Sequence, residues 1–140
     1  YNHWLLLENL LIKDEIEAMK KFSNDEGLIS ATAFLEHSDP SSSHKKMSAI
    51  ITPIYNHGSL EKTLKNKKLA LTFQEKLKIA RDISSGLNSL HSKGYAHRDL
   101  GARNHFVSIE VLSANKRIVT CVIADLEKVS PVGKLKGHGV

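Results

Sequence analysis

The residues best suited to chemistry stand in one short stretch, residues 97–104, which reads HRDLGARN. This stretch brings an imidazole, two guanidinium groups, a carboxylate and a carboxamide into eight residues. A helix would point these groups in different directions, whereas a loop that follows a helix can direct them to one place. The segment before it carries the clearest helix signal in the chain, so we expect a loop of functional groups held at the end of a rigid element.

Three oxygen-bearing side chains suggest what this loop does. Asp99 and Asn104 lie at its two ends, and Asp125 follows the β-branched run 118–124, which predicts a buried strand. If that strand pairs with a short strand after Asn104, the three side chains converge. Such oxygens suit Mg²⁺, and phosphoryl transfer needs that cation with a carboxylate that accepts a proton. Either aspartate alone is more simply a turn or strand-end residue, and only the joint pattern favours a site.

The long helix before the loop is predicted over residues 72–94. Thr72 and Glu75 fit a capping box, apolar residues then recur at helical spacing, and Gly94 suits the closing position. Its length matches the diameter of a small domain, so we expect it to be central and buried.

Weaker patterns predict the other elements. Residues 1–12 cannot be typed, and the C-terminal residues 130–140 are expected to be mobile. The expected elements are an amphipathic helix (13–22), a hairpin of two antiparallel strands (28–35 and 47–54) around a polar loop (37–46), a short helix (60–66), a short strand (105–107) and a long connection (108–117) before the strand at 118–124.

The composition is that of an ordinary globular chain. With 140 residues, 41% of them hydrophobic, it can bury one core. The net charge of +5 comes from scattered lysines and arginines, which favours anionic ligands weakly and does not indicate nucleic acid binding. No apolar run could span a bilayer, and the single Cys121 fits a buried thiol in a reducing compartment. We therefore expect a cytoplasmic protein. Because Tyr1 is not methionine, we also expect a piece of something longer, and a membrane is involved only if the missing parts include a receptor segment.

In order along the chain, these motifs resemble the middle of a eukaryotic-type protein kinase domain. Catalytic loops of that family read H-R-D-L-x-x-x-N, which residues 97–104 match in full. Glu15 in EIEAMKK stands where the family has its C-helix glutamate, and IITPIYNHGSL (50–60) resembles the strand and hinge beside the adenine pocket. VIADLE (122–127) stands where V-x-x-D-F-G stands. The resemblance covers about residues 14–129 and is carried most specifically by the loop.

The resemblance implies a partial protein-kinase fold of the α+β class. Residues 1–54 would be the remainder of the N-lobe, with antiparallel strands and the C-helix, and residues 55–59 the hinge. Residues 60–129 would be the core of the helical C-lobe, and residues 130–140 the start of the activation segment. The helices that follow in the family would bury the underside of the long helix, so this stretch alone should expose apolar surface.

The family's site residues carry over to matching positions. Asp99 would accept the proton of the substrate hydroxyl, Arg98 would meet a phosphate, and His97 would pack with Met19 and Leu126. Arg103 would belong to the catalytic group with Asp99 and Asn104. The implied Mg²⁺ ligands are Asn104 and Asp125, and the implied ATP contacts are Glu15, Thr52 at the gatekeeper position, Pro53, Ile54, Tyr55 and Phe106.

Two positions bear on the substrate. Serine/threonine kinases of the family usually have lysine two residues after the catalytic aspartate, where this chain has Gly101, and Arg103 resembles the tyrosine-kinase form. The resemblance therefore implies ATP- and Mg²⁺-dependent phosphoryl transfer to a protein hydroxyl, with tyrosine as the favoured acceptor.

The chain also departs from the family pattern. The Gly-rich phosphate loop and the lysine that pairs with Glu15 would lie at or before the start of the chain, and Lys13 cannot replace that lysine because it lies on the same helix. Glu127 replaces the glycine of the D-F-G triplet and puts a negative charge near bound phosphates. We therefore keep two hypotheses, an active kinase, which we favour for the longer protein, and a pseudokinase that acts as a binding module. A small helical protein unrelated to kinases is the third and weakest hypothesis. From these 140 residues alone we expect no meaningful turnover.

Overall fold

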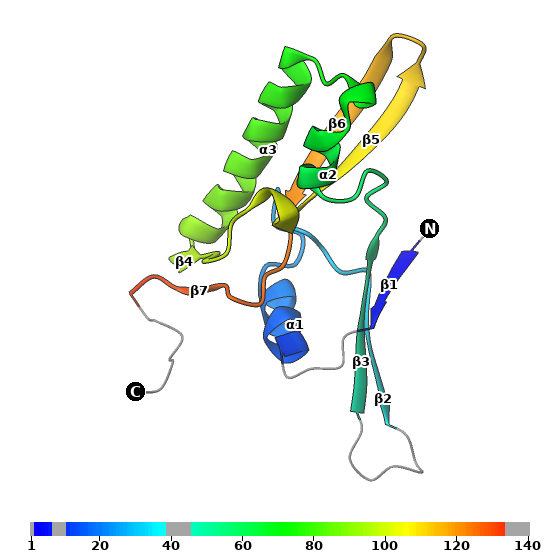
Figure 1. Ribbon diagram of the computed structural model, residues 1–140. Helices are drawn as coiled ribbons and strands as arrows, with labels where there is room; N and C mark the ends of the chain where they lie inside the picture. The colour runs from blue at the N-terminus through cyan, green and yellow to red at the C-terminus, as the bar shows by residue number, and fades with distance from the viewer. Residues whose placement is uncertain (1, 7–10, 39–45, 134–140) are drawn as a thin grey trace.

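A computed structural model describes residues 2–6, 11–38 and 46–133 of the chain. Its elements lie in two parts (Figure 1), a small sheet with one helix and a second part in which a long helix lies along a hairpin. Along the chain the elements are β1 (Asn2–Leu6), α1 (Leu11–Lys21), β2 (Ala33–Ser38), β3 (Lys46–Pro53), α2 (Leu60–Lys65), the 3-10 helix η1 (Lys67–Leu69), α3 (Phe73–His91), β4 (Tyr95–Ala96), the 3-10 helix η2 (Ala102–Asn104), β5 (His105–Ser113), β6 (Lys116–Ile123) and β7 (Ser130–Pro131).

The first part is an antiparallel sheet in the order β1-β3-β2 with α1 beside it. Its helix confirms the amphipathic pattern, since Met19 and Phe22 are buried while the charged residues are exposed, except for the half-buried Glu15. The strand predicted at 28–35 begins only at Ala33. The prediction was wrong at its start because Leu28 and Ile29 are buried against the second part, where the Ile29 N–H donates to the Ile123 carbonyl at 2.8 Å.

The long helix α3 begins with the predicted capping box. The Glu75 N–H donates to Thr72 Oγ1 at 3.1 Å, and the Thr72 N–H donates to Glu75 Oε2 at 2.9 Å. Arg117 of β6 donates to the same carboxylate at 2.6 Å, and this hydrogen bond lowers the pKa of Glu75 to about 2.

The prediction that this helix is central and buried was wrong. Only one side packs on β6, so that Phe73 is 72% exposed and Leu77 52% exposed, which agrees with the apolar surface expected for this stretch.

The hairpin of β5 and β6 is longer than predicted. Its ladder runs from the pair His105 and Ile123 to the pair Ser113 and Lys116, with an irregularity after Val111. The connection expected over 108–117 is therefore mostly strand. The strand pattern was hard to recognise because the outer half of the hairpin is not buried and has no apolar face. Even the apolar Val111 in this half is 72% exposed.

The loop after α1 holds the two parts together at two glycines. Gly27 has a left-handed φ of 75°, and a Cβ added to Gly86 of α3 would lie 2.6 Å from the Gly27 carbonyl oxygen. That oxygen also accepts a hydrogen bond from the Ile123 N–H at 2.8 Å. The close approach is open only to glycine, and it brings the loop after α1 directly against α3.

A second attachment lies just after β3. The carboxamide of Asn56 behaves like a strand neighbour of β5, because its Nδ2 donates to the Ile109 carbonyl at 2.9 Å and its Oδ1 accepts from the Ile109 N–H at 2.8 Å. The His57 N–H then donates to the Val107 carbonyl at 3.0 Å. The segment predicted as a hinge is thus tied to β5 along its second half. Among the described residues, no helix combines the length and apolar character needed to cross a bilayer.

Candidate active site

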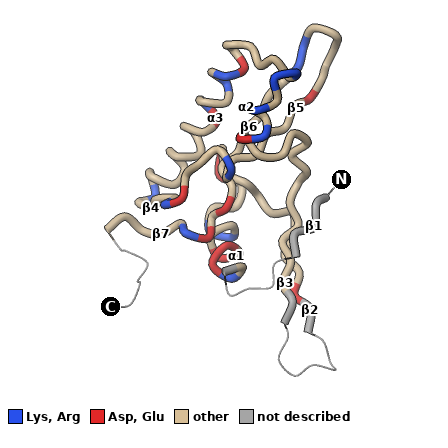
Figure 2. The backbone as a smooth tube through the Cα atoms, in the orientation of Figure 1, with Lys and Arg blue, Asp and Glu red and all other residues tan. Residues whose placement is uncertain are grey.

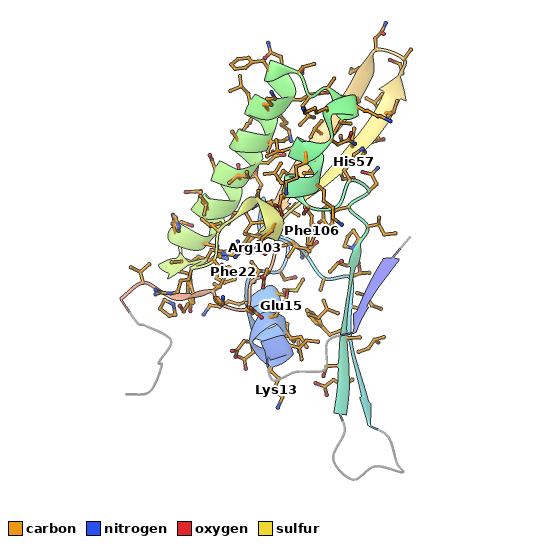
Figure 3. The ribbon with its side chains drawn as sticks, in the orientation of Figure 1. Lys13, Glu15, Phe22, His57, Arg103 and Phe106 are labelled. Atoms are coloured by element: carbon orange, nitrogen blue, oxygen red, sulfur yellow. The ribbon has the colours of Figure 1, made fainter. Side chains whose placement is uncertain are left out.

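A cavity of about 610 Å³ lies between the two parts and is lined from α1, β3, the segment after β3, η2 and β5. It brings together every residue predicted to contact the nucleotide and both predicted metal ligands. Those residues are Glu15, Thr52, Pro53, Ile54, Tyr55, Phe106, Asn104 and Asp125. Asp99 and Arg103 do not line the cavity and stand beside it through Asn104, with Arg103 labelled near Phe106 in Figure 3.

One end of the cavity is flat and apolar. The rings of Tyr55 and Phe106 are stacked with centroids 6.0 Å apart and planes 22° apart. A backbone bridge between Ser59 and Phe106 holds this arrangement, and burial raises the pKa of the Tyr55 hydroxyl. Two stacked aromatic rings on the cavity wall suit a planar heterocycle that stacks against them.

The cavity is also lined by three acidic residues, Glu15, Asp125 and Glu127, and by one basic residue, Lys62. Burial, followed by the nearby charges of Asp125 and Glu127, raises the pKa of Glu15 to about 7. No ion pair within the described part of the chain includes Glu15. Figure 3 shows the Lys13 side chain directed away from Glu15 and from the second part, which agrees with the prediction that it cannot neutralise this carboxylate.

Asn104 and Asp125, which both line the cavity, are the residues that could hold a hard cation. Asp125 has a left-handed φ of 56°, which turns the chain sharply as β6 ends. The Asn104 side chain donates through Nδ2 to the Asp99 carbonyl at 2.8 Å, so its Oδ1 remains as the atom for a metal. Within the described residues, His, Cys, Asp and Glu side chains form no group of three that could hold a metal alone. A Mg²⁺ ion there would therefore need oxygen atoms from its ligand.

Asp99 has compensating charges around it. Arg103 donates to its Oδ1 at 2.6 Å, Asn104 to its Oδ2 at 3.3 Å, and Lys128 lies 3.4 Å from Oδ2. Desolvation raises the pKa of Asp99, but Arg103 and Lys128 outweigh it and the pKa falls below its ordinary value. The carboxylate is therefore ionised at neutral pH and its direction is set by three neighbours.

The loop is anchored by the residues before Asp99. His97 is 1% exposed, accepts a hydrogen bond from the Asp99 N–H on Nδ1 at 3.2 Å and donates from Nε2 to the Ala124 carbonyl at 2.8 Å. Arg98 has a left-handed φ of 68° and donates to the Pro131 carbonyl at 2.8 Å and to the hydroxyl of Ser130, which is buried. Met19 and Leu126, the expected neighbours of His97, are also buried.

Two polar contacts of this site were missed from the sequence. Asn56 holds the hinge to β5, and Lys128 reaches Asp99, although no role was predicted for either side chain. Both contacts join residues far apart in the chain, so no local spacing announces them. The absence of a side chain at Gly101 leaves room for the guanidinium group of Arg103, because a Cβ at position 101 would lie 2.9 Å from Arg103 Nη1.

Comparison with known proteins gives a consistent match. A family model described as protein tyrosine and serine/threonine kinase matches residues 7–126. Protein-tyrosine kinase 6 of Homo sapiens is 33% identical over 108 residues, which cover 76% of this chain and 22% of that protein. Tyrosine-protein kinase FRK of Homo sapiens is 44% identical over 61 residues, 41% of this chain and 12% of FRK. Serine/threonine-protein kinase TOS3 of Saccharomyces cerevisiae (strain ATCC 204508 / S288c) is 30% identical over 115 residues, 77% of this chain and 20% of TOS3. The chain spans less than a quarter of the length of each of these relatives.

Proposed function

Since this chain belongs to the protein tyrosine and serine/threonine kinase family, we propose that the protein containing it transfers the terminal phosphoryl group of ATP to a protein hydroxyl. The observation that carries the proposal is the cavity between the two parts, which joins a stacked aromatic wall to Asn104 and Asp125 and lies beside Asp99. Such a cavity suits a nucleotide whose base lies on the apolar wall and whose phosphates reach the oxygen-bearing residues.

Each residue then has one task. The backbone from Thr52 to Tyr55 would bind the edge of the adenine, with Phe106 against its face. Asn104 and Asp125 would hold Mg²⁺, which when bound neutralises the phosphate charge. Asp99, held by Arg103 and Asn104, would orient the substrate hydroxyl and take its proton.

A phosphotransfer assay tests this proposal directly. The protein that contains these residues in their natural context is incubated with Mg²⁺, labelled ATP and an equimolar pool of tyrosine, serine and threonine peptides. Label on peptide is the expected result. If the protein binds Mg²⁺ and ATP but labels no peptide, the enzymatic proposal is wrong.

The same assay identifies the acceptor. We propose tyrosine, because position 101 is glycine and Arg103 bonds to Asp99 across it. The relatives in the comparison include both tyrosine and serine/threonine kinases and support only the coarser class. Label confined to serine or threonine would refute tyrosine specificity and leave the proposed reaction intact.

One observation favours a second candidate, a pseudokinase that binds a partner without turnover. Glu127 lines the cavity with Asp125 and Glu15. At about 5 Å and an effective dielectric of about 20, one such charge would repel a phosphate charge by roughly 3 kcal/mol. Glu127→Gly should therefore tighten Mg²⁺-ATP binding, by up to about 100-fold in a calorimetric titration. Unchanged affinity would remove the charge argument for a pseudokinase.

We also propose a cytoplasmic location, where ATP is available. Cys121 supports it weakly, because the thiol is free and buried, and its burial raises its pKa to about 12. A thiol of this kind is unreactive and needs no oxidising compartment.

A further inference from the structure

Lys128 is the residue of the site that no motif assigns, and its position is unusual. It lies three residues after Asp125, yet its Nζ is 3.4 Å from Oδ2 of Asp99. The same Oδ2 accepts from Asn104 Nδ2 at 3.3 Å. The ammonium group therefore stands at the place where the proposed proton acceptor meets one of the proposed metal ligands.

This place is where the transferring phosphoryl group would pass under the proposed function. The substrate oxygen approaches from the side of Asp99, and the nucleotide phosphates approach from the side of Asn104 and Asp125. Negative charge on the phosphoryl oxygens would then lie between these residues, and a cation there stabilises it.

The catalytic loop offers no flexible cation of its own at this point. Gly101 has no side chain, and the space above it is taken by Arg103, whose Nη1 would lie 2.9 Å from an added Cβ. Arg103 itself is engaged with Oδ1, the other oxygen of Asp99, at 2.6 Å. The charge beside Oδ2 is thus supplied from outside the loop.

Lys128 is held loosely enough to change partners. Its side chain is 57% exposed, and its distance of 3.4 Å to Asp99 is long beside the 2.6 Å of Arg103. Exposed ion pairs of this kind contribute little to folding. A lysine is a compact charge on a flexible stem, so it can leave a carboxylate for an arriving phosphate.

We propose that Lys128 binds the terminal phosphate of ATP and takes the place of a cation that the catalytic loop lacks at Gly101. The inference rests on the proposed function for its substrate. In the step it assists, the substrate oxygen forms a bond to the terminal phosphorus while the bond from that phosphorus to the bridging oxygen of ADP breaks. ADP leaves with the electron pair, and the hydroxyl proton goes to Asp99.

Binding and turnover of Lys128→Met together test the role. Affinities for ATP and for ADP, each with Mg²⁺, are measured by calorimetry on the whole protein, and peptide phosphorylation gives kcat and KM. We expect ATP affinity to fall about tenfold with ADP affinity unchanged, because only ATP carries the terminal phosphate. We expect kcat to fall by at least as much, and Lys128→Arg to restore most of both. Lys67→Met, an exposed lysine of η1 outside the cavity, is the matched control and should change neither.

The outcomes separate the two proposals. If the wild type transfers phosphate and Lys128→Met does so with the same kcat and ATP affinity, Lys128 is only a surface ion pair and the inference is overturned while the proposed function stands. If the wild type shows no turnover but prefers ATP over ADP, and Lys128→Met loses that preference, the phosphate contact is supported and the enzymatic proposal fails. If the wild type binds neither nucleotide, both are overturned.

Discussion

The carboxylate of Asp99 and the carboxylates that line the cavity belong to one site, and their surroundings are opposite. Asp99 in the loop has Arg103, Lys128 and Asn104 within hydrogen-bond or ion-pair distance, and its pKa is lowered. Glu15 in the cavity is desolvated beside Asp125 and Glu127, and its pKa is raised to about 7. The carboxylate of Asp99 is thus stabilised in its ionised form, whereas ionisation of Glu15 is opposed by burial and by the neighbouring negative charges.

The difference teaches where charge must come from. Asp99 has its compensating groups in place, because Arg103 and Asn104 follow it in the loop and Lys128 reaches it from outside the loop. The cavity has a surplus of negative charge within the described residues, and a cation bound there would relieve it. Figure 2 shows acidic segments on α1 and beneath the loop, in the part of the molecule where that cation would bind. The negative charge of Asp99 is therefore already compensated by the protein, whereas compensation of the negative charge in the cavity depends on a bound ligand.

The largest effect is expected from breaking the loop side. Asp99→Asn keeps the shape of the side chain and removes the proposed proton acceptor, so kcat for peptide phosphorylation should fall by about 10²–10⁴-fold. Mg²⁺-ATP affinity should change little, because Asp99 does not line the cavity.

The matched control is Asp25→Asn, which removes a similar exposed ion pair, to Lys93, away from the cavity. It should retain wild-type turnover. Equal activity in Asp99→Asn and Asp25→Asn would show that the compensated carboxylate has no chemical task.

A second change tests whether the two sides depend on the fixed distance between the parts. Gly86→Ala places a Cβ 2.6 Å from the Gly27 carbonyl oxygen, which is backbone and cannot rotate away. We expect the free energy of unfolding to fall by about 1–3 kcal/mol in urea denaturation. Asn88→Ala, an exposed position on the same helix, is the control and should cost less than about 1 kcal/mol. Wild-type stability in Gly86→Ala would mean that the contact is not a constraint.

The smallest effect concerns the cavity side and depends on pH. A folded-state pKa of about 7 against an ordinary 4.5 means that the folded protein keeps the Glu15 proton longer than the unfolded chain does. The resulting stability is fully present below pH 4.5 and is lost as pH rises through about 7. Allowing for partial exposure, this loss is about 1–2 kcal/mol.

Glu15→Gln removes that titration. The difference in free energy of unfolding between wild type and variant, measured in urea at pH 4.5 and at pH 8, should therefore shift against the wild type at the higher pH. The same change in the free energy of unfolding between pH 4.5 and pH 8 in both proteins would show that the pKa of Glu15 is not raised in the folded state.

Local patterns predicted the parts of this molecule whose causes are local. Thr72 and Glu75 are three residues apart and formed the expected capping box. The loop motif placed Asp99 and Asn104, and the β-branched run placed Asp125 at the end of a strand. The convergence of Asn104 and Asp125 on one cavity is what that pattern required.

The parts that were missed have distant causes. Leu28 and Ile29 were read as strand because their side chains are apolar, yet they are buried by Ile123, which lies far along the chain. The outer hairpin was read as a connection because its pairing carries little burial. The contact of Lys128 was missed, since no spacing in the sequence relates it to Asp99. Contacts across long separations set each of these features.

The two attachments between the parts also define a direction of motion. Gly27 is fixed against Gly86 and Ile123 on one side, and Asn56 is fixed to Ile109 on the other. A body pinned at two points can rotate freely only about the line that joins them. The helix α1 cannot take part in this motion, because Phe22 at its end packs against Tyr95 and Asp25 pairs with Lys93. The sheet of β1–β3 alone should therefore rotate about an axis through Gly27 and Asn56, and this rotation would open the mouth of the cavity while its wall at Phe106 stays still.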